Sequence, residues 1–293
     1  MEQAVVDING LSRAFGSKTA LHDVTFRATA GQVHGLVGAN GAGKTTFIKH
    51  VLGLLRATSG SVRVFGLDPV RDPVGVLSRV GYLSEEHDLP EWMRVDELMG
   101  YTQAYHPSWD AKYARELLDT FALDPTKKIK ELSKGMRAQA GLIAAVAHRP
   151  ELLILDEPSS GLDALVRRDI LDAIVRAVAD DGRTVIFSSH LLDEVERVSD
   201  HLAMLHQGTL KLCAPLEEIK ARHRRVSLRF EVPRTEPPEV AGAIRVDGAG
   251  REWTVIADAK RTFAPAAAHH LGAVIVEDAE ASLDEIFVAH AGH

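Results

Sequence analysis

The residues with the clearest chemical potential form a glycine-rich segment that ends in a lysine and two threonines. Two glycines bracket four residues ahead of Lys44 and Thr45, which is the spacing of a phosphate-binding loop. Backbone N–H groups of such a loop face phosphate oxygens, Lys44 reaches the β and γ phosphates, and the Thr45 hydroxyl ligates Mg²⁺. The competing interpretation is a chance glycine turn beside a solvated lysine. The residues expected to surround the phosphates are Gly38, Asn40, Gly41, Ala42, Gly43, Lys44, Thr45 and Thr46.

Three further residues suit phosphoryl transfer, which needs a metal ion, a positioned water and a group that senses the terminal phosphate. Asp156 and Glu157 follow a wholly apolar run. We expect Asp156 to hold Mg²⁺ opposite Thr45, and Glu157 to accept a proton from the attacking water. His190 ends another apolar run and is expected to contact the γ phosphate and orient that water. Alone, these patterns also fit an acidic loop and a helix cap, but a phosphate loop on the same sheet favours chemistry.

The elements around these residues predict an α/β fold with a mostly parallel sheet, because strand and helix patterns alternate along the chain. Parallel strands present their carboxyl ends at one edge, which would bring the loop and the three catalytic candidates together. Strands are expected at residues 32–37, 80–84, 152–155, 184–190 and 201–205. Helices are expected at residues 46–55, 137–148, 163–179 and 191–198.

An antiparallel layer is expected beside the phosphate loop. Short runs at residues 4–8 and 21–26 look like its strands, and Gly10 and residues 16–18 are turn signals. A further short strand is expected at residues 61–66, after the helix that follows the phosphate loop. Phe15 lies in the predicted turn and is the one aromatic side chain free to stack on a nucleotide base. A role in filling the core fits the pattern equally well.

The composition is that of a globular protein that can form one large and one small domain. The chain has 293 residues, of which 45% are hydrophobic. Its net charge of −7 provides no global basic surface, so we expect no nucleic-acid partner. The single cysteine, Cys213, excludes a disulfide framework and suits a reducing cytoplasm. No secretion signal and no run of 18 uncharged apolar residues occurs, so we expect a cytoplasmic location.

Changes in pattern suggest the domain limits. Helical spacing at residues 95–105 and 111–123, with Asp110 as a cap, predicts a helical subdomain over about residues 86–150. Beyond Gly208, prolines and glycines punctuate short strands at residues 226–232, 244–246 and 253–256, between helices at 214–219 and 282–291. We therefore expect a principal domain over residues 1–213 and a small α+β accessory domain over 214–293. The basic run at residues 222–225 is expected to be a solvated surface, with anionic-lipid contact as the sharper alternative.

The chain resembles the nucleotide-binding subunit of an ATP-binding-cassette (ABC) transporter, because residues 4–210 contain every segment of that family in order. Beyond the phosphate loop, Asp156–Glu157 and His190, these are Glu85, the signature at residues 132–136 and the segment 160–163. The resemblance implies a P-loop NTPase fold, ATP and Mg²⁺ as ligands, and Glu85 as a further group near the metal. It also implies ATP hydrolysis coupled to transport.

The resemblance further implies a dimer. In this family two cassettes pack head to tail, so ATP on the phosphate loop of one is completed by the signature segment of the other. Ser133 and Gly135 would supply a hydroxyl, N–H groups and a helix N-terminus to the γ phosphate, and Asp163 would adjoin the nucleotide. The implied partners are a second cassette, identical or related, and integral membrane subunits, with the chain peripheral on the inner face of the cell membrane.

This sequence departs from the family at two places. The signature usually reads Leu-Ser-Gly-Gly-Gln, whereas Lys134 and Met136 replace the first glycine and the glutamine. We expect a working site, because Ser133 and Gly135 are kept, and we expect Lys134 to point into solvent. Glu85 stands where the family usually carries glutamine, and it can still reach Mg²⁺ or its water.

These departures, together with the helix start at residues 109–110 and the ending at 282–287, resemble the branch that powers ABC-2-type exporters. The expected function is therefore that of an ATPase subunit of such an exporter. Alternatives are an importer ATPase and a soluble cassette acting on a ribosome or DNA, although the tandem cassettes or long coiled-coil insertions of the latter groups are absent. Trp92 and Met93 are candidates for lining the groove that receives a membrane partner, with buried packing as the other interpretation.

Overall fold

The structure is a computed structural model that describes residues 4–86, 88–179, 182–258 and 272–292. The chain forms two compact units, Met1–Cys213 and Ala214–His293. Within the described ranges, every helix is too short or too polar to cross a membrane.

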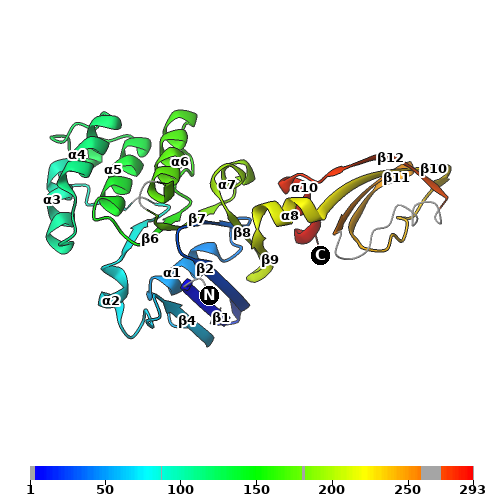
Figure 1. The fold of residues 1–293 in the computed structure, drawn as a ribbon, viewed down its shortest axis with the longest axis horizontal. Helices are drawn as coiled ribbons and strands as arrows, with labels where there is room; N and C mark the ends of the chain where they lie inside the picture. Colours follow the sequence, from blue (N-terminus) through cyan, green and yellow to red (C-terminus); the bar gives the residue numbers. More distant parts are fainter. Residues whose placement is uncertain (1–3, 87, 180–181, 259–271, 293) are drawn as a thin grey trace. The chain divides into compact units, whose positions relative to one another are not determined.

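A six-stranded sheet forms the centre of the first unit (Figure 1), with the strand order β5-β6-β7-β3-β8-β9. All neighbours from β5 to β8 in this order pair in parallel. Every residue of β3, β6 and β7 is buried, as parallel strands covered on both faces require. The prediction of a mostly parallel α/β sheet is confirmed. The strands are β3 (Val33–Val37), β5 (Val80–Leu83), β6 (Leu152–Asp156), β7 (Thr184–Ser189), β8 (His201–His206) and β9 (Thr209–Pro215).

A second, antiparallel sheet has the order β2-β1-β4, which confirms the predicted antiparallel layer. Its strands are β1 (Ala4–Phe15), β2 (Lys18–Thr29) and β4 (Ser59–Val64). Gly10 lies within β1 instead of ending it. Helix α1 (Lys44–Val51) belongs to the same hydrophobic core as both sheets, which also holds Phe26 of the antiparallel sheet and Ile154 of the parallel one. The rings of Phe26 and Phe47 meet edge to face, so the core fixes the helix that follows the phosphate loop.

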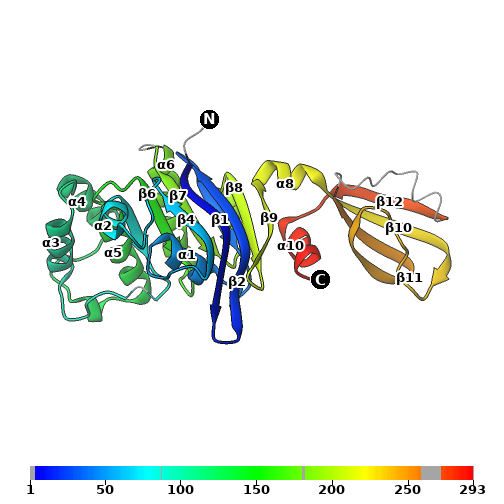
Figure 2. The same cartoon turned by 90° about the horizontal axis from the view of Figure 1, so that it is seen from below.

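The remaining helices of the first unit pack on the parallel sheet and on one another. Helices α3, α4 and α5 lie together beyond the β5 edge of this sheet (Figures 1 and 2). Asp110 caps α4 as predicted, since its carboxylate accepts hydrogen bonds from the N–H groups of Lys112 and Tyr113. These helices are α2 (Pro73–Leu77), α3 (Val95–Tyr105), α4 (Ala111–Thr120), the 3₁₀ helix η1 (Ile129–Glu131), α5 (Lys134–Val146), α6 (Ala164–Ala179) and α7 (Leu192–Val198).

Three helices of this unit differ from their predicted limits by three residues or more, and α4 ends at Thr120 instead of residue 123. Helix α1 ends at Val51 instead of residue 55, because Gly53 turns the chain with a φ of +72°. A Cβ at Gly53 would lie 2.2 Å from the Pro69 carbonyl oxygen, so only glycine fits this turn. Helix α5 begins at Lys134, three residues earlier than predicted, because the Ser133 hydroxyl caps it by accepting from the Met136 N–H.

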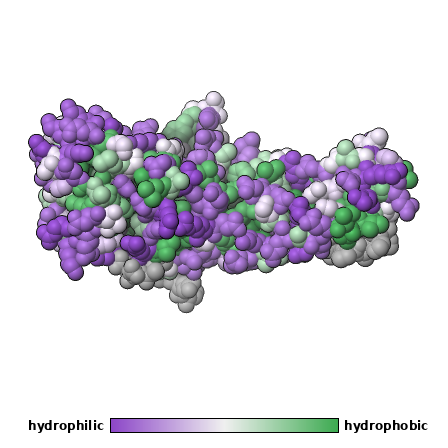
Figure 3. Space-filling view, turned by 90° about the horizontal axis from the view of Figure 1, so that it is seen from above, coloured by the Kyte–Doolittle hydropathy of each residue, from purple (hydrophilic) through white to green (hydrophobic). Residues whose placement is uncertain are grey.

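In its described residues, the second unit contains a three-stranded antiparallel sheet with the order β11-β10-β12 and two helices (Figure 2). One face of the sheet buries Phe230 and Trp253 in a core of its own. Figure 3 shows apolar side chains gathered over this sheet, where Val232, Val274 and Val276 are exposed. The elements are α8 (Leu216–Arg222), β10 (His223–Arg234), β11 (Ala243–Asp258), β12 (Ala273–Glu280) and α10 (Leu283–Ala291).

The strand predictions for the second unit are partly wrong. The segments 244–246 and 253–256 belong to one long strand, β11, because the chain continues through Gly248 and Gly250 with positive φ angles instead of turning back. Strands β9 and β12 have no predicted counterpart. Helix α8 begins two residues later than predicted, since Ala214 and Pro215 end β9. The final helix was placed correctly and starts with a capping box between Ser282 and Glu285.

The basic run at residues 222–225 is not a solvated surface, which corrects that expectation. Arg222 pairs with Asp258, Arg224 with Asp278 at 2.9 Å, and Arg225 with Glu277 at 2.6 Å, while His223 is fully buried. Carboxylates from β11 and β12 therefore neutralise the run, because β10 lies between those two strands. The same pairing removes the free charge that anionic lipid would need.

Candidate nucleotide site

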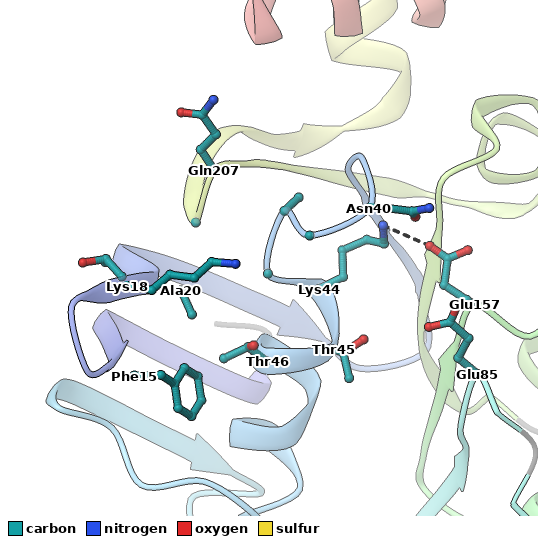
Figure 4. A pocket seen from close by; sticks show the side chains of 15 residues that line it. Phe15, Lys18, Ala20, Asn40, Lys44, Thr45, Thr46, Glu85, Glu157 and Gln207 are labelled. Carbon is teal, nitrogen blue, oxygen red and sulfur yellow. Dashed lines mark ion pairs between the residues drawn. The ribbon is translucent and has the colours of Figure 1, made fainter.

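A pocket of about 590 Å³ opens at the start of α1 (Figure 4). The phosphate loop, the β1–β2 turn and the turn between β8 and β9 contribute to its wall. Phe15 and the two carboxylates Glu85 and Glu157 lie on opposite sides of it in this view. Its lining residues are Phe15, Lys18, Thr19, Ala20, residues 40–46, Glu85, Glu157, Gln207 and Gly208.

The glycines of the loop are required by its geometry. Gly43 has a φ of +111°, and a Cβ there would lie 2.8 Å from the Ala20 carbonyl oxygen. A Cβ at Gly38 would lie 2.4 Å from the Leu205 carbonyl oxygen. Lys44 starts α1 and its Nζ donates to the Gly38 carbonyl at 2.5 Å, so the lysine is held over the loop. The chance-turn interpretation is therefore replaced by a built cradle of N–H groups and one ammonium group, which suits a phosphate.

Glu157 connects the loop to the end of β7. Its Oε1 lies 2.9 Å from Lys44 Nζ, and its Oε2 lies 2.6 Å from His190 Nδ1. Glu157 is buried and has a φ of +47°, a conformation that costs energy for a residue with a side chain. The strained backbone turns the carboxylate away from β6 and toward the loop. The structure thus brings together the three residues that sequence analysis assigned to catalysis.

Asp156 immediately precedes Glu157, and its side chain has different contacts. The Ser188 hydroxyl donates to its Oδ1 at 2.7 Å and accepts from the Glu157 N–H at 2.9 Å. Among the described residues, the buried Oδ2 of Asp156 has no hydrogen-bond partner. Burial raises the pKa of this carboxyl, with the Ser188 hydrogen bond opposing the shift. An unpartnered buried carboxylate oxygen is the kind of ligand that a hard divalent cation takes.

Thr45 and Glu85 lie between Glu157 and Asp156, in the sense that they share a pocket with each of these carboxylates. Both line the nucleotide pocket, and both also line a second pocket of about 620 Å³ that includes Asp156. Two carboxylates and a hydroxyl thus border one space, and an oxygen-rich set of this type fits Mg²⁺. Among the described residues, no cluster of three close His, Cys, Asp or Glu side chains forms a complete metal cage. Mg²⁺ usually keeps several waters and is shared with substrate phosphates, so a partial set is what such a site needs.

Phe15 is 46% exposed and lines the pocket, so the interpretation that it fills the core is wrong. The Arg13 guanidinium lies over its ring, 4.5 Å from the centroid. This contact stiffens the ring while one face stays open.

Four predicted nucleotide contacts do not line the pocket: Gly38 at the start of the phosphate loop, and three residues farther along the chain. Ser133 is exposed at the start of α5, and Gly135 is buried there, where a Cβ would lie 2.9 Å from Val166 Cγ2. Asp163 is exposed and caps α6 by accepting from the N–H groups of Leu165 and Val166. None of the three lines the pocket of its own chain.

Lys134 does not point freely into solvent, which corrects the prediction. Its Nζ donates to the Ser160 carbonyl at 2.6 Å. The ammonium therefore joins the start of α5 to the segment that follows Glu157.

Met93 and Trp92 have opposite environments. Met93 is buried in the core, so the packing interpretation is correct for it, whereas Trp92 is 71% exposed. The aromatic side chains Tyr101 and Tyr105 of α3 are also exposed and meet edge to face.

Sequence reasoning missed the side chains that hold the catalytic candidates. Ser188 joins Asp156 to the backbone of Glu157, and Glu194 accepts from two serines next to the catalytic segments. The two serines that precede His190 are evident in the sequence. The contact between Ser159 and Glu194, which are 35 positions apart, is not evident there.

Comparison with known proteins assigns the family. The sequence profile described as ABC transporter matches residues 21–160. The daunorubicin/doxorubicin resistance ATP-binding protein DrrA of Streptomyces peucetius is 30% identical over 98% of this chain and 92% of its own length. The chain belongs to the ABC transporter family. It is an ATP-binding subunit and an ATPase, as predicted.

Two further matches agree with this ABC assignment. The bacitracin transport ATP-binding protein BcrA of Bacillus licheniformis is 30% identical over 78% of this chain and 75% of its own length. The structure of an ATP-binding subunit of an ABC transporter matches with a TM-score of 0.69 and 30% identity, covering 74% of this chain and 92% of that one. The predicted P-loop NTPase fold is thereby confirmed.

Proposed function

We propose that this ABC ATPase powers an ABC-2-type exporter by ATP-dependent closure of a cassette dimer. The observation that carries the proposal is the match to DrrA, which extends over nearly the whole chain and includes residues beyond the cassette. The name of that relative refers to drug resistance, and export of the drug is a direct route to resistance. The signature departures at Lys134 and Met136 agree with the same branch.

ATP would lie with its phosphates on residues 38–46 and its base on Phe15. Lys44 would neutralise the β and γ phosphates, and the N–H groups of the loop would hold their oxygens. Mg²⁺ would be held by Thr45 and Asp156, with Glu85 near its waters, and would neutralise charge on the β and γ phosphates when bound.

Hydrolysis would use Glu157 as the base and His190 as the group that positions the water. The 2.6 Å contact between His190 and Glu157 fixes both side chains before substrate arrives. Glu157 Oε2 can accept the water proton, while the imidazole orients the water toward the γ phosphate. Lys44 Nζ, 2.9 Å from Oε1, orients the carboxylate toward the phosphate loop.

A second copy of this chain would complete the site. Ser133, Gly135 and Asp163 lie outside the pocket of their own chain, yet the N-terminus of α5 carries the hydroxyl and N–H groups that suit a phosphate. A head-to-tail dimer would place these groups against the γ phosphate of the partner.

The membrane subunits would dock on the helical region formed by α3, α4 and α5. Trp92, Tyr101 and Tyr105 expose aromatic surface there, which suits an apolar helix of a partner. We propose that the chain is peripheral on the inner face of the cell membrane, that residues 1–213 form the ATPase domain with residues 86–150 as its helical subdomain, and that residues 214–293 form an accessory domain.

Affinity purification from native membranes in mild detergent tests this function. A polytopic membrane protein with spans of about 20 apolar residues should copurify with the chain. Cells that carry the pair should lose a preloaded fluorescent drug faster than cells with Lys44→Ala. Recovery of ribosomes or DNA alone, or drug accumulation in place of loss, would contradict the proposal.

A further inference from the structure

A buried carboxylate outside the nucleotide pocket accepts hydrogen bonds from two separate segments. Glu194 lies in α7 and is only 2% exposed. Its Oε2 accepts from the Ser159 hydroxyl at 2.7 Å and from the Ser189 hydroxyl at 2.9 Å. Its Oε1 lies 3.2 Å from Arg167 Nε of α6. A buried carboxylate is costly unless hydrogen-bonded and paired, and these three groups meet that need.

The two serines belong to the two segments that carry the catalytic candidates. Ser159 lies two residues after Glu157, and the Ser160 N–H donates to the Glu157 carbonyl at 3.0 Å, which closes a tight turn between them. A displacement of Ser159 is therefore passed to Glu157.

Ser189 holds the other segment from both sides. It immediately precedes His190, and its hydroxyl oxygen also accepts from the Leu191 N–H at 3.0 Å. The backbone on each side of His190 is thus tied to one hydroxyl, which in turn donates to Glu194. The backbone at His190 is therefore held in place by these bonds.

We propose that Glu194 is a positioning residue that sets the 2.6 Å contact between Glu157 and His190. One carboxylate oxygen serves both serines, so it ties the segment that follows β6 to the end of β7, beyond the last paired residues Asp156 and Ser188. Glu194 acts through these serines and does not line the nucleotide pocket. This inference rests on the proposed catalytic roles of Glu157 and His190.

A carboxylate is better suited than an amide to this position. Oε2 receives two O–H donors at once, and Oε1 faces the Arg167 guanidinium. In Glu194→Gln, an amide oxygen placed toward the serines would turn the NH₂ group toward Arg167, so two donors would oppose each other. We call the contacts of Glu194 with Ser159 and Ser189 the Glu194 bridge. Glu194→Gln should therefore weaken this bridge without changing side-chain volume.

Steady-state ATPase assays on the full chain test the bridge through Ser159→Ala and Ser189→Ala, each of which removes one hydroxyl. Each variant should lower kcat about tenfold, because a small misplacement of catalytic groups is costly. KM for ATP should change less than about twofold, since the phosphate loop is untouched. The double variant should resemble the single variants, because either substitution opens the same bridge.

Ser108→Ala is the matched control. Its hydroxyl donates to the His148 carbonyl at 2.7 Å, away from the catalytic segments, and its loss should leave kcat unchanged. Crystal structures give a readout independent of turnover: the Glu157–His190 separation should widen in Ser159→Ala/Ser189→Ala and in Glu194→Gln, and stay at 2.6 Å in Ser108→Ala.

The possible outcomes distinguish failure of the Glu194 bridge from failure of the catalytic roles proposed for Glu157 and His190. Normal turnover in Glu157→Gln would overturn the proposed base. Loss of turnover in Glu157→Gln, with normal kcat and an unchanged Glu157–His190 contact in both serine variants, would overturn the bridge alone. Multiplying losses in the double variant, about a hundredfold in total, would also contradict it by showing two independent effects.

Discussion

The phosphate-loop end and the signature end of the cassette differ in how completely they are built. At the loop, Glu157 contacts both Lys44 and His190, and Lys44 and Glu157 line the pocket. At the start of α5, Ser133 is exposed and Gly135 packs on Val166, and neither lines that pocket. Under the proposed function, one end would be a nearly complete catalytic site and the other an exposed helix start suited to an anion, which is the division that two chains sharing a site would need.

Removal of the base at the complete end should have the largest effect. Glu157→Gln should lower kcat about a thousandfold, because general base catalysis contributes on that scale, while ATP binding persists. A phosphate-release assay with an equilibrium binding measurement checks both parts. Glu151→Gln, which loses only a surface pair with Arg79, is the matched control and should turn over normally. Similar losses in both variants would mean that the comparison reflects damage to the fold.

Substitution at the signature end should affect turnover without affecting nucleotide binding by a single chain. Gly135→Ala places a methyl 2.9 Å from Val166, so α5 must shift, and we expect kcat to fall about a hundredfold. Gly100→Ala in α3 meets no atom within 4 Å and should be neutral or slightly stabilising.

The double variant Gly135→Ala/Val166→Ala sharpens this test, because it restores space beside α5. Recovery of kcat would assign the effect of Gly135 to packing alone. Continued loss would agree with a phosphate contact that needs an unobstructed backbone at position 135.

Both ends should lose stability together on acidification. Burial lowers the pKa of His34, ahead of the phosphate loop, and of His148, after α5, from 6.5 to about 4. The unfolded chain binds protons at these histidines more readily than the folded chain does. The contribution of the neutral histidines to the free energy of unfolding is therefore fully present above pH 6.5 and is lost as the pH falls toward 4. Each histidine should cost about 2 kcal/mol of unfolding free energy at pH 5.

Denaturant unfolding at pH 7.5 and pH 5 measures this effect. His34→Gln and His148→Gln should each flatten the pH dependence, and a surface His22→Gln should not. A wild-type free energy of unfolding that is equal at both pH values would contradict the assignment.

The smallest effect is expected at Lys134. Lys134→Ala removes one exposed hydrogen bond to the Ser160 carbonyl and should lower kcat about threefold, a change of about 0.6 kcal/mol. Lys130→Ala, on the adjacent 3₁₀ helix, serves as the control for loss of charge. Equal kcat values for the two variants would show that the Lys134 bond does not couple the two ends.

Predictions from the sequence were most accurate where a chemically distinctive residue follows a clear local pattern. The phosphate loop, Asp156, Glu157 and His190 each follow a short apolar run, and parallel strands necessarily align their carboxyl ends. Sequence-based prediction missed contacts between residues that are far apart in the chain. Examples are the contacts of Lys134 with Ser160, Arg224 with Asp278, and Glu194 with Ser159. Glycines misled it in β11, since Gly248 and Gly250 read as turns but lie within a strand. Such pairings depend on tertiary packing, which local propensity does not encode.

The claim with the widest consequences is that a second chain completes the nucleotide site. Light scattering during size-exclusion chromatography of Glu157→Gln tests it directly, because this variant should retain ATP. With ATP and Mg²⁺ the mass should double relative to the nucleotide-free chain, and Gly135→Asp added to this variant should return it to one chain while ATP remains bound. A single-chain mass with ATP bound to Glu157→Gln, or a dimer that persists with Gly135→Asp, would contradict the account.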